Sequence, residues 1–107
     1  MITQIHRDTF DVVVGGATCR LYDYKSHLYI SSVYTEPQER GKGFASQMMQ
    51  EIVDFAKATN QKVQLEVGAF YRDAPATLNN DQLLAFYGKF GFQKTRGTRM
   101  EYDPCQQ

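Results

Sequence analysis

A short run between a predicted strand and a predicted helix has the composition of an anion-binding loop. It places two glycines beside basic residues, in the order Arg40-Gly41-Lys42-Gly43-Phe44-Ala45. Glycine lets the main chain approach an anion closely, and the first N–H groups of a helix have no partners within the helix. The loop would therefore hold a phosphate or pyrophosphate, with charge added by Arg40 or Lys42. A plain strand-to-helix turn has the same composition and is the alternative.

The spacing excludes two common nucleotide-binding loops and matches a third kind. A third glycine is absent, as is Gly-Lys followed by Ser or Thr, so neither a dinucleotide fingerprint nor a Walker loop fits. Arg40-x-x-Gly43-x-Ala45, preceded by Val33-Tyr34-Thr35-x-Pro37, resembles the coenzyme A signature of the GNAT superfamily of N-acetyltransferases. A later segment is also similar to this family, with Asn80 opening a short helix that leads to Tyr87-x-x-x-Gly91-Phe92.

The resemblance implies acetyl-CoA as co-substrate and direct transfer of its acetyl group to a primary amine in a ternary complex, without a metal. The main-chain amides of the loop would bind the pyrophosphate. The main chain of Val33 and Tyr34 would bind the pantetheine arm as an added strand does. Asn80 would also contact the coenzyme, although a role as helix N-cap explains this residue equally well. The cofactor-binding residues so implied are Val33, Tyr34, Arg40, Gly41, Lys42, Gly43, Phe44, Ala45 and Asn80.

The same resemblance implies catalytic roles for a tyrosine and a carboxylate. Tyr87 occupies the place of the tyrosine that protonates the departing sulfur, and a phenol with a pKa near 10 can donate to a developing thiolate. Glu66, in Leu65-Glu66-Val67, matches the base of bacterial ribosomal-protein alanine acetyltransferases. Glu36 and a chain of waters are the competing bases. The ordinary alternatives are a packing tyrosine and a solvated glutamate.

Length and composition favour one soluble domain over residues 1–107. The 12 basic and 12 acidic residues give a formal charge of zero, so nucleic acid and anionic membranes are not expected partners. The two cysteines, Cys19 and Cys105, argue against a disulfide framework and for the cytoplasm, and no apolar run suits a signal peptide or a membrane span. His6 and His27 lack the spacing of a metal site and are assigned to surface turns. Cys19 has no partner for covalent catalysis.

An α+β fold is expected to position these residues. Strands are predicted over 9–14, 17–24, 28–34, 63–67, 92–95 and 98–102, and helices over 44–59 and 80–90. A right-handed crossover makes strands 28–34 and 63–67 parallel neighbours. The family resemblance implies that these two strands splay around coenzyme A within a mixed, mostly antiparallel sheet with helices packed on its faces.

One departure from the family concerns the acceptor site. Most members place two helices between their first and second strands, over the acceptor amine, but only about eight residues precede Thr9 here. The site would then be open or completed by the partner in a homodimer. The irregular segment 68–79, with Phe70, Tyr71 and Arg72, is expected either to line it or merely to cover a sheet edge. The alternative function is a catalytically degenerate binding module that acts through protein contacts.

Overall fold

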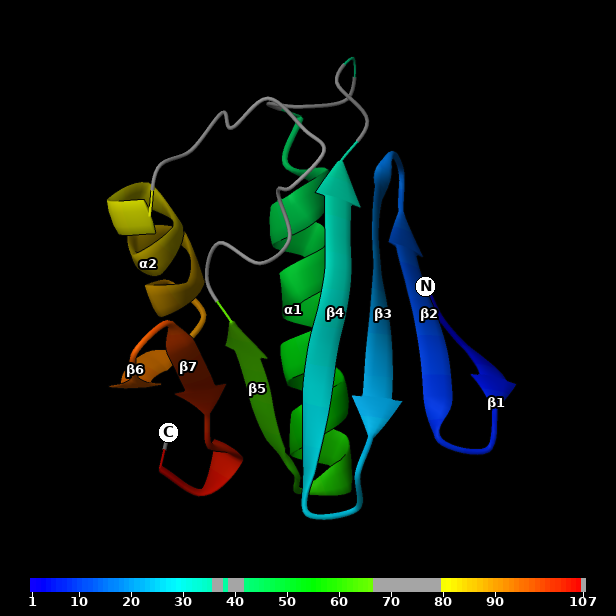
Figure 1. Ribbon diagram of the computed structural model, residues 1–107. Helices are drawn as coiled ribbons and strands as arrows, with labels where there is room; N and C mark the ends of the chain where they lie inside the picture. The colour runs from blue at the N-terminus through cyan, green and yellow to red at the C-terminus, as the bar shows by residue number, and fades with distance from the viewer. Residues whose placement is uncertain (36–37, 39–41, 67–79, 107) are drawn as a thin grey trace.

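One mixed sheet forms the centre of the molecule (Figure 1). The computed structural model describes residues 1–35, 38, 42–66 and 80–106. In these ranges seven strands lie in the order β1-β2-β3-β4-β5-β7-β6, and only β4 and β5 are parallel. The strands are β1 Ile2–His6, β2 Thr9–Val14, β3 Ala17–Asp23, β4 His27–Thr35, β5 Lys62–Glu66, β6 Gln93–Arg96 and β7 Arg99–Tyr102; the helices are α1 Phe44–Thr59 and α2 Asn80–Gly88. The predicted α+β fold with its central parallel pair is confirmed.

The core lies between the sheet and α1. Alternate strand residues such as Val12, Leu21 and Ile30 point to this side and are buried. They meet the stripe of α1 that the helical period predicts, and its buried members are Met48, Met49, Ile52, Val53 and Ala56. Tyr87 of α2 belongs to the same buried cluster, so both helices contribute to one core. Burial of these apolar side chains is the main force that holds α1 in place.

The opposite face of the sheet is polar and partly exposed. The intervening residues of the strands point to it, among them Asp11, Arg20, Tyr29, Gln64 and Glu101. No helix in the described ranges packs on this side, which we call the open face. A tight turn stands where the family resemblance implies two helices, because β1 ends at His6 and β2 begins at Thr9.

β1 is an element that the sequence pattern did not reveal. It pairs antiparallel with β2, Ile2 opposite Val12 and Thr3 opposite Asp11. Only Ile2 of this strand is partly buried. A polar edge strand has no alternation of apolar residues for sequence reasoning to detect. His6 and His27 lie at strand ends, so their assignment to turns is wrong; His27 pairs with Lys62 in the parallel ladder.

The carboxyl end of each helix is followed by a residue in the left-handed conformation. α1 stops at Asn60, which adopts a left-handed conformation with φ 55°, and Gly91 after α2 has φ 96°. The carboxyl-terminal tail forms a short 3₁₀ helix, Pro104–Gln106. Its Cys105 thiol donates to Asn60 Oδ1 at 3.3 Å, which ties the tail to the end of α1. Neither described helix is both long and apolar enough to cross a membrane.

Candidate functional site

The parallel strands β4 and β5 separate towards their carboxyl ends. They pair only over three positions, from His27 opposite Lys62 to Tyr29 opposite Gln64. β4 continues to Thr35, while the end of β5 pairs on its other side with β7. Figure 1 shows β5 leaning away from β4 above this point. The described ladder therefore has the divergence that the family resemblance implies.

A bulge shapes the end of β4 next to this divergence. Thr18 lies opposite Tyr34 and Arg20 opposite Ser31, so two steps along β3 correspond to three along β4. The extra residue re-aims the side chains that follow it. Val33 is buried in the core, and Tyr34 is 39% exposed on the open face. Both predicted pantetheine-binding residues thus lie on the strand that leads to the anion-binding loop.

The amino end of α1 has the form expected of an anion site. Gly43 is the N-cap with φ 83°, a left-handed conformation that favours glycine, and a Cβ built on it meets nothing within 4 Å. Among the described residues no side chain caps this end, and the first turn carries no acidic residue. Lys42 and Gly43 are exposed, whereas Phe44 and Ala45 are half-buried against the core. The first N–H groups and the positive end of the helix dipole lie next to this open space at Gly43, as in an anion site.

Glu66 lies on the open face at the end of β5. It is opposite Arg99 of β7, and Arg99 Nη2 donates to Glu66 Oε1 at 3.2 Å. Tyr29 of β4 lies near this pair. Burial and then the Glu66 carboxylate raise the pKa of the Tyr29 hydroxyl, and Arg99 opposes them. Glu66 thus has a cationic partner and a protonated phenol as neighbours.

Tyr87 lies on the helix side of the sheet and not on the open face. Its side chain is 1% exposed and its hydroxyl oxygen is buried. The ring packs edge-on against Phe86 and Phe92, with centroids 5.3 and 6.2 Å away. The two predicted catalytic groups Tyr87 and Glu66 therefore belong to opposite sides of the sheet.

An aromatic cluster on and beside the open face was not predicted. Tyr24 stacks on Tyr22 at 6.2 Å, and its ring lies 5.4 Å from His27 and 6.5 Å from Tyr29. Tyr24 is 55% exposed. The signal available in the sequence is the period-two spacing of these rings, at 22 and 24 and again at 27 and 29. Because Tyr29 also neighbours Glu66, the cluster extends towards the candidate base.

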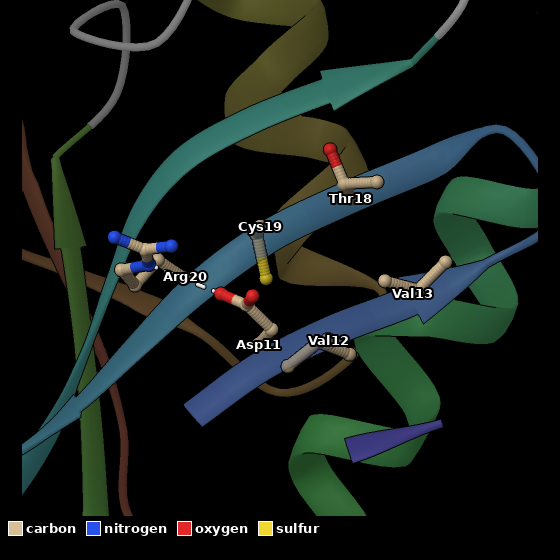
Figure 2. A pocket seen from close by; sticks show the side chains of 6 residues that line it. All are labelled: Asp11, Val12, Val13, Thr18, Cys19 and Arg20. Atoms are coloured by element: carbon tan, nitrogen blue, oxygen red, sulfur yellow. Dashed lines mark hydrogen bonds and ion pairs between the residues drawn. The ribbon is translucent and has the colours of Figure 1, made fainter. Parts of the chain in front are cut away.

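A hollow of about 390 Å³ lies over β2 and β3 (Figure 2). Its lining residues are Asp11, Val12, Val13, Thr18, Cys19 and Arg20, none of them a predicted site residue. Asp11 and Arg20 form an ion pair at 3.0 Å across the strands. Burial, reinforced by Asp11, raises the pKa of the Cys19 thiol to about 12. Cys19 is therefore protonated and a poor nucleophile, as the sequence suggested.

Several predicted residues lie outside the described ones. Glu36, Arg40, Gly41 and the segment 68–79 are in this group. Asn80 is the first described residue of α2. In the described part of the chain, no three His, Cys, Asp or Glu side chains gather as metal ligands.

Comparison with solved structures gives the same fold. The anti-CRISPR protein AcrVA5 superposes with a TM-score of 0.72 at 15% identity, over 90% of this chain and 99% of that one. The ribosomal-protein-S18-alanine N-acetyltransferase of Escherichia coli gives 0.67 at 16% identity, over 94% of this chain and 71% of that one. The PaiA N-acetyltransferase of Thermoplasma acidophilum, solved with coenzyme A, gives 0.61 at 18% identity, over 89% and 59%.

Sequence comparison identifies the family directly. A search of curated proteins found no match. The family profile described as the acetyltransferase (GNAT) family matches residues 4–92, which include both motifs up to Phe92. The profile covers most of the chain, and the diverging β4–β5 pair and the glycine-led start of α1 fit it. The chain is a member of the acetyltransferase (GNAT) family.

Proposed function

We propose that this protein is an N-acetyltransferase that moves an acetyl group from acetyl-CoA to a primary amine by direct transfer in a ternary complex. The observation that carries the proposal is the coincidence of two features at one end of the sheet. β4 and β5 stop pairing after Tyr29, and α1, the next helix after β4 in the described ranges, begins at a glycine-led amino end that no described side chain caps. Because the chain belongs to the acetyltransferase (GNAT) family, we interpret these two features as a binding site for coenzyme A.

The described residues fit acetyl-CoA as a co-substrate. The open space at Gly43 lets phosphate oxygens approach the main chain, and the amides of Phe44 and Ala45 begin the helix there. Lys42 adds a nearby cation. Beyond Tyr29, the β4 edge that faces the divergence would bind the pantetheine amides as an added strand does. Arg40, Gly41 and the side chain of Asn80 complete the proposed binding set.

The proposed chemistry needs one proton acceptor and one proton donor. When bound, acetyl-CoA supplies an activated acyl carbon. An alkyl amine is almost fully protonated at pH 7, so a base must take its proton before attack. Glu66 is the proposed base, with Glu36 as the competing one. As the carbon–nitrogen bond forms and the carbon–sulfur bond breaks, Tyr87 would donate its proton to the sulfur.

The positions of Glu66 and Tyr87 fit one group that accepts a proton and another that donates one. Glu66 lies on the open face and Tyr87 on the helix side, with the end of β5 between them. An amine that arrives over the open face would meet Glu66 first. A thiolate that leaves between β4 and β5 would meet the helix side. Proton removal and proton delivery would then occur on opposite sides of the reacting carbon.

The acceptor is proposed to bind on the open face. In the described ranges no helix encloses this face, so the site suits an extended or large acceptor or one held by the partner in a homodimer. The solved E. coli relative is described as acting on an alanine of a ribosomal protein. Peptides with a free amino terminus, lysine peptides, polyamines and aminoglycosides are therefore the acceptor classes to test. The free Cys19 and Cys105 fit a reducing compartment such as the cytoplasm.

Two measurements test the proposal. Acetyl-CoA at 100 times its Kd should raise the free energy of unfolding by about 2.7 kcal/mol, which thermal unfolding detects. Mass spectrometry of an acceptor panel incubated with acetyl-CoA should show a gain of one acetyl group in one class. Binding without transfer to any class would support the alternative, a binding module. The ion pair that engages Glu66 is the observation that favours this alternative.

A further inference from the structure

Gly15, in the turn between β2 and β3, lies directly against the first residue of α1. A Cβ built on Gly15 would lie 2.7 Å from Cγ, Cδ2 and Cε2 of Phe44. These atoms belong to the rigid ring of Phe44, and Cγ is the atom that joins the ring to Cβ. A small rotation of the side chain therefore cannot remove the overlap with a Cβ at position 15. The ring of Phe44 therefore packs directly against Gly15, at a position where only glycine fits.

Phe44 connects this contact to the candidate coenzyme site. It follows the N-cap Gly43, and it packs against the core cluster. The first hydrogen bond of α1 runs from the Gln47 amide to the Gly43 carbonyl at 3.0 Å. The position of the Phe44 ring thus determines where the first amides of α1 point. We propose that Gly15 is a positioning residue that seats Phe44 and thereby holds the coenzyme-binding end of α1 in place.

This inference rests on the proposed function only for its binding readout. Gly15→Ala should weaken acetyl-CoA binding about tenfold or more, because small displacements of a binding group have large effects. Gly97→Ala is the matched control. Gly97 has the same φ of 56°, so alanine meets the same backbone strain, but its Cβ would have nothing within 4 Å. Affinity in Gly97→Ala should stay within about twofold of wild type.

A double-mutant cycle tests whether Gly15 acts through the ring. In a Phe44→Ala background the overlap is gone, so adding Gly15→Ala should change affinity less than about twofold. Calorimetry measures the acetyl-CoA affinity of wild type, Gly15→Ala, Phe44→Ala and the double variant. Equal losses from Gly15→Ala in both backgrounds, or wild-type affinity in folded Gly15→Ala, would overturn the inference. An equal loss in Gly97→Ala would overturn it as well.

A ligand-free measurement separates failure of this inference from failure of the proposed function. Hydrogen exchange at the Gln47 amide should be faster in Gly15→Ala than in wild type and in Gly97→Ala. This holds even if the wild-type chain binds no acetyl-CoA, a result that would refute the proposed function alone. If Gly15→Ala does not fold, Phe44→Leu reads the same contact, with faster exchange expected. Unchanged exchange in the folded variant overturns the inference.

Discussion

Glu66 and Arg99 face each other across β5 and β7, and their side chains form an ion pair with Arg99 Nη2 3.2 Å from Glu66 Oε1. Both side chains are partly exposed, so the pair itself adds little to stability. Its importance is chemical, because Arg99 engages one oxygen of the carboxylate that is proposed to take a proton from the amine. The pair holds the side chain of this candidate base beside β7.

The first prediction tests Glu66 as the base. Glu66→Gln keeps the size and a hydrogen-bond acceptor for Arg99 but cannot take a proton, so kcat should fall by about 10². Affinity for acetyl-CoA should not change. Glu101→Gln is the control, because Glu101 is a neighbouring carboxylate on β7 that accepts a hydrogen bond from Gln64 at 2.9 Å. Steady-state kinetics decide the matter; equal activity in both variants would leave Glu36 or water as the base.

A second prediction concerns Gly43. Its φ of 83° makes Gly43→Ala strained, at a cost of about 1–2 kcal/mol in the free energy of unfolding. In the free protein the new Cβ meets open space, so the fold should survive. Phosphates in that space should be displaced, and the Kd for acetyl-CoA should rise at least about tenfold. Calorimetry on folded protein gives the answer, and an unchanged Kd would remove the pyrophosphate assignment.

The aromatic cluster gives a third prediction. If the acceptor binds over the open face, Tyr24→Ala should raise the acceptor KM by about threefold or more, since an exposed ring contributes roughly 1 kcal/mol of contact. The KM for acetyl-CoA should stay the same. Ile5→Ala removes another exposed apolar side chain, on β1, and should change neither KM. A rise in the acetyl-CoA KM alone would contradict an acceptor role for Tyr24.

The fourth prediction follows from the raised pKa of Cys19. Burial, with a smaller effect of Asp11, raises this pKa from an ordinary 9.0 to about 12. Between these values the unfolded thiol loses its proton while the folded thiol keeps it. Stability should therefore fall as pH rises above 9, by about 1.4 kcal/mol per pH unit from this group.

Urea unfolding at pH 8, 9 and 10 measures this effect as the difference between wild type and Cys19→Ala. That difference should shrink as pH rises, because the variant lacks the buried thiol. Cys105→Ser, which alters an exposed thiol, should follow the wild-type pH dependence. A constant difference between wild type and Cys19→Ala would show that the thiol has an ordinary pKa in the folded protein.

How much of this structure the sequence predicts depends on whether a feature is local. The α1 stripe follows from short-range spacing, and the structure confirms it. β1 has no such spacing, because only Ile2 is partly buried. An edge strand of mostly exposed residues is held by main-chain pairing with β2, which leaves no pattern in its side chains.

In the candidate site, too, some residues can be predicted from local motifs and others cannot. The glycines of the loop, Tyr87 and Glu66 stand in motifs that a reader can find along the chain. Arg99, the partner of Glu66, is 33 residues away in sequence, and only the β5–β7 register brings the two together. The contact between Gly15 and Phe44 likewise depends on how the β2–β3 turn meets α1. Such partners follow from tertiary packing, and no local spacing encodes them.

The last prediction compares two buried tyrosines. Tyr87 and Tyr102 are each 1% exposed with a buried hydroxyl oxygen, and both rings lie near Phe92, at 6.2 and 5.8 Å. Tyr87→Phe keeps the packing and removes the proton. If Tyr87 protonates the leaving sulfur, kcat should fall by about 10² with little change in acetyl-CoA affinity. Wild-type kcat should decline at high pH, where a phenol loses its proton, and this decline should be absent in the variant.

Tyr102→Phe is the matched control for loss of a buried hydroxyl. Among the described residues the Tyr102 hydroxyl has no hydrogen-bond partner, and burial, followed by Asp54 and Asp103, raises its pKa. Its removal should leave kcat unchanged and raise the free energy of unfolding by about 1 kcal/mol, because an unpaired polar group returns to water on unfolding. If the two variants keep the same kcat, Tyr87 is a packing residue and the thiolate takes its proton from water.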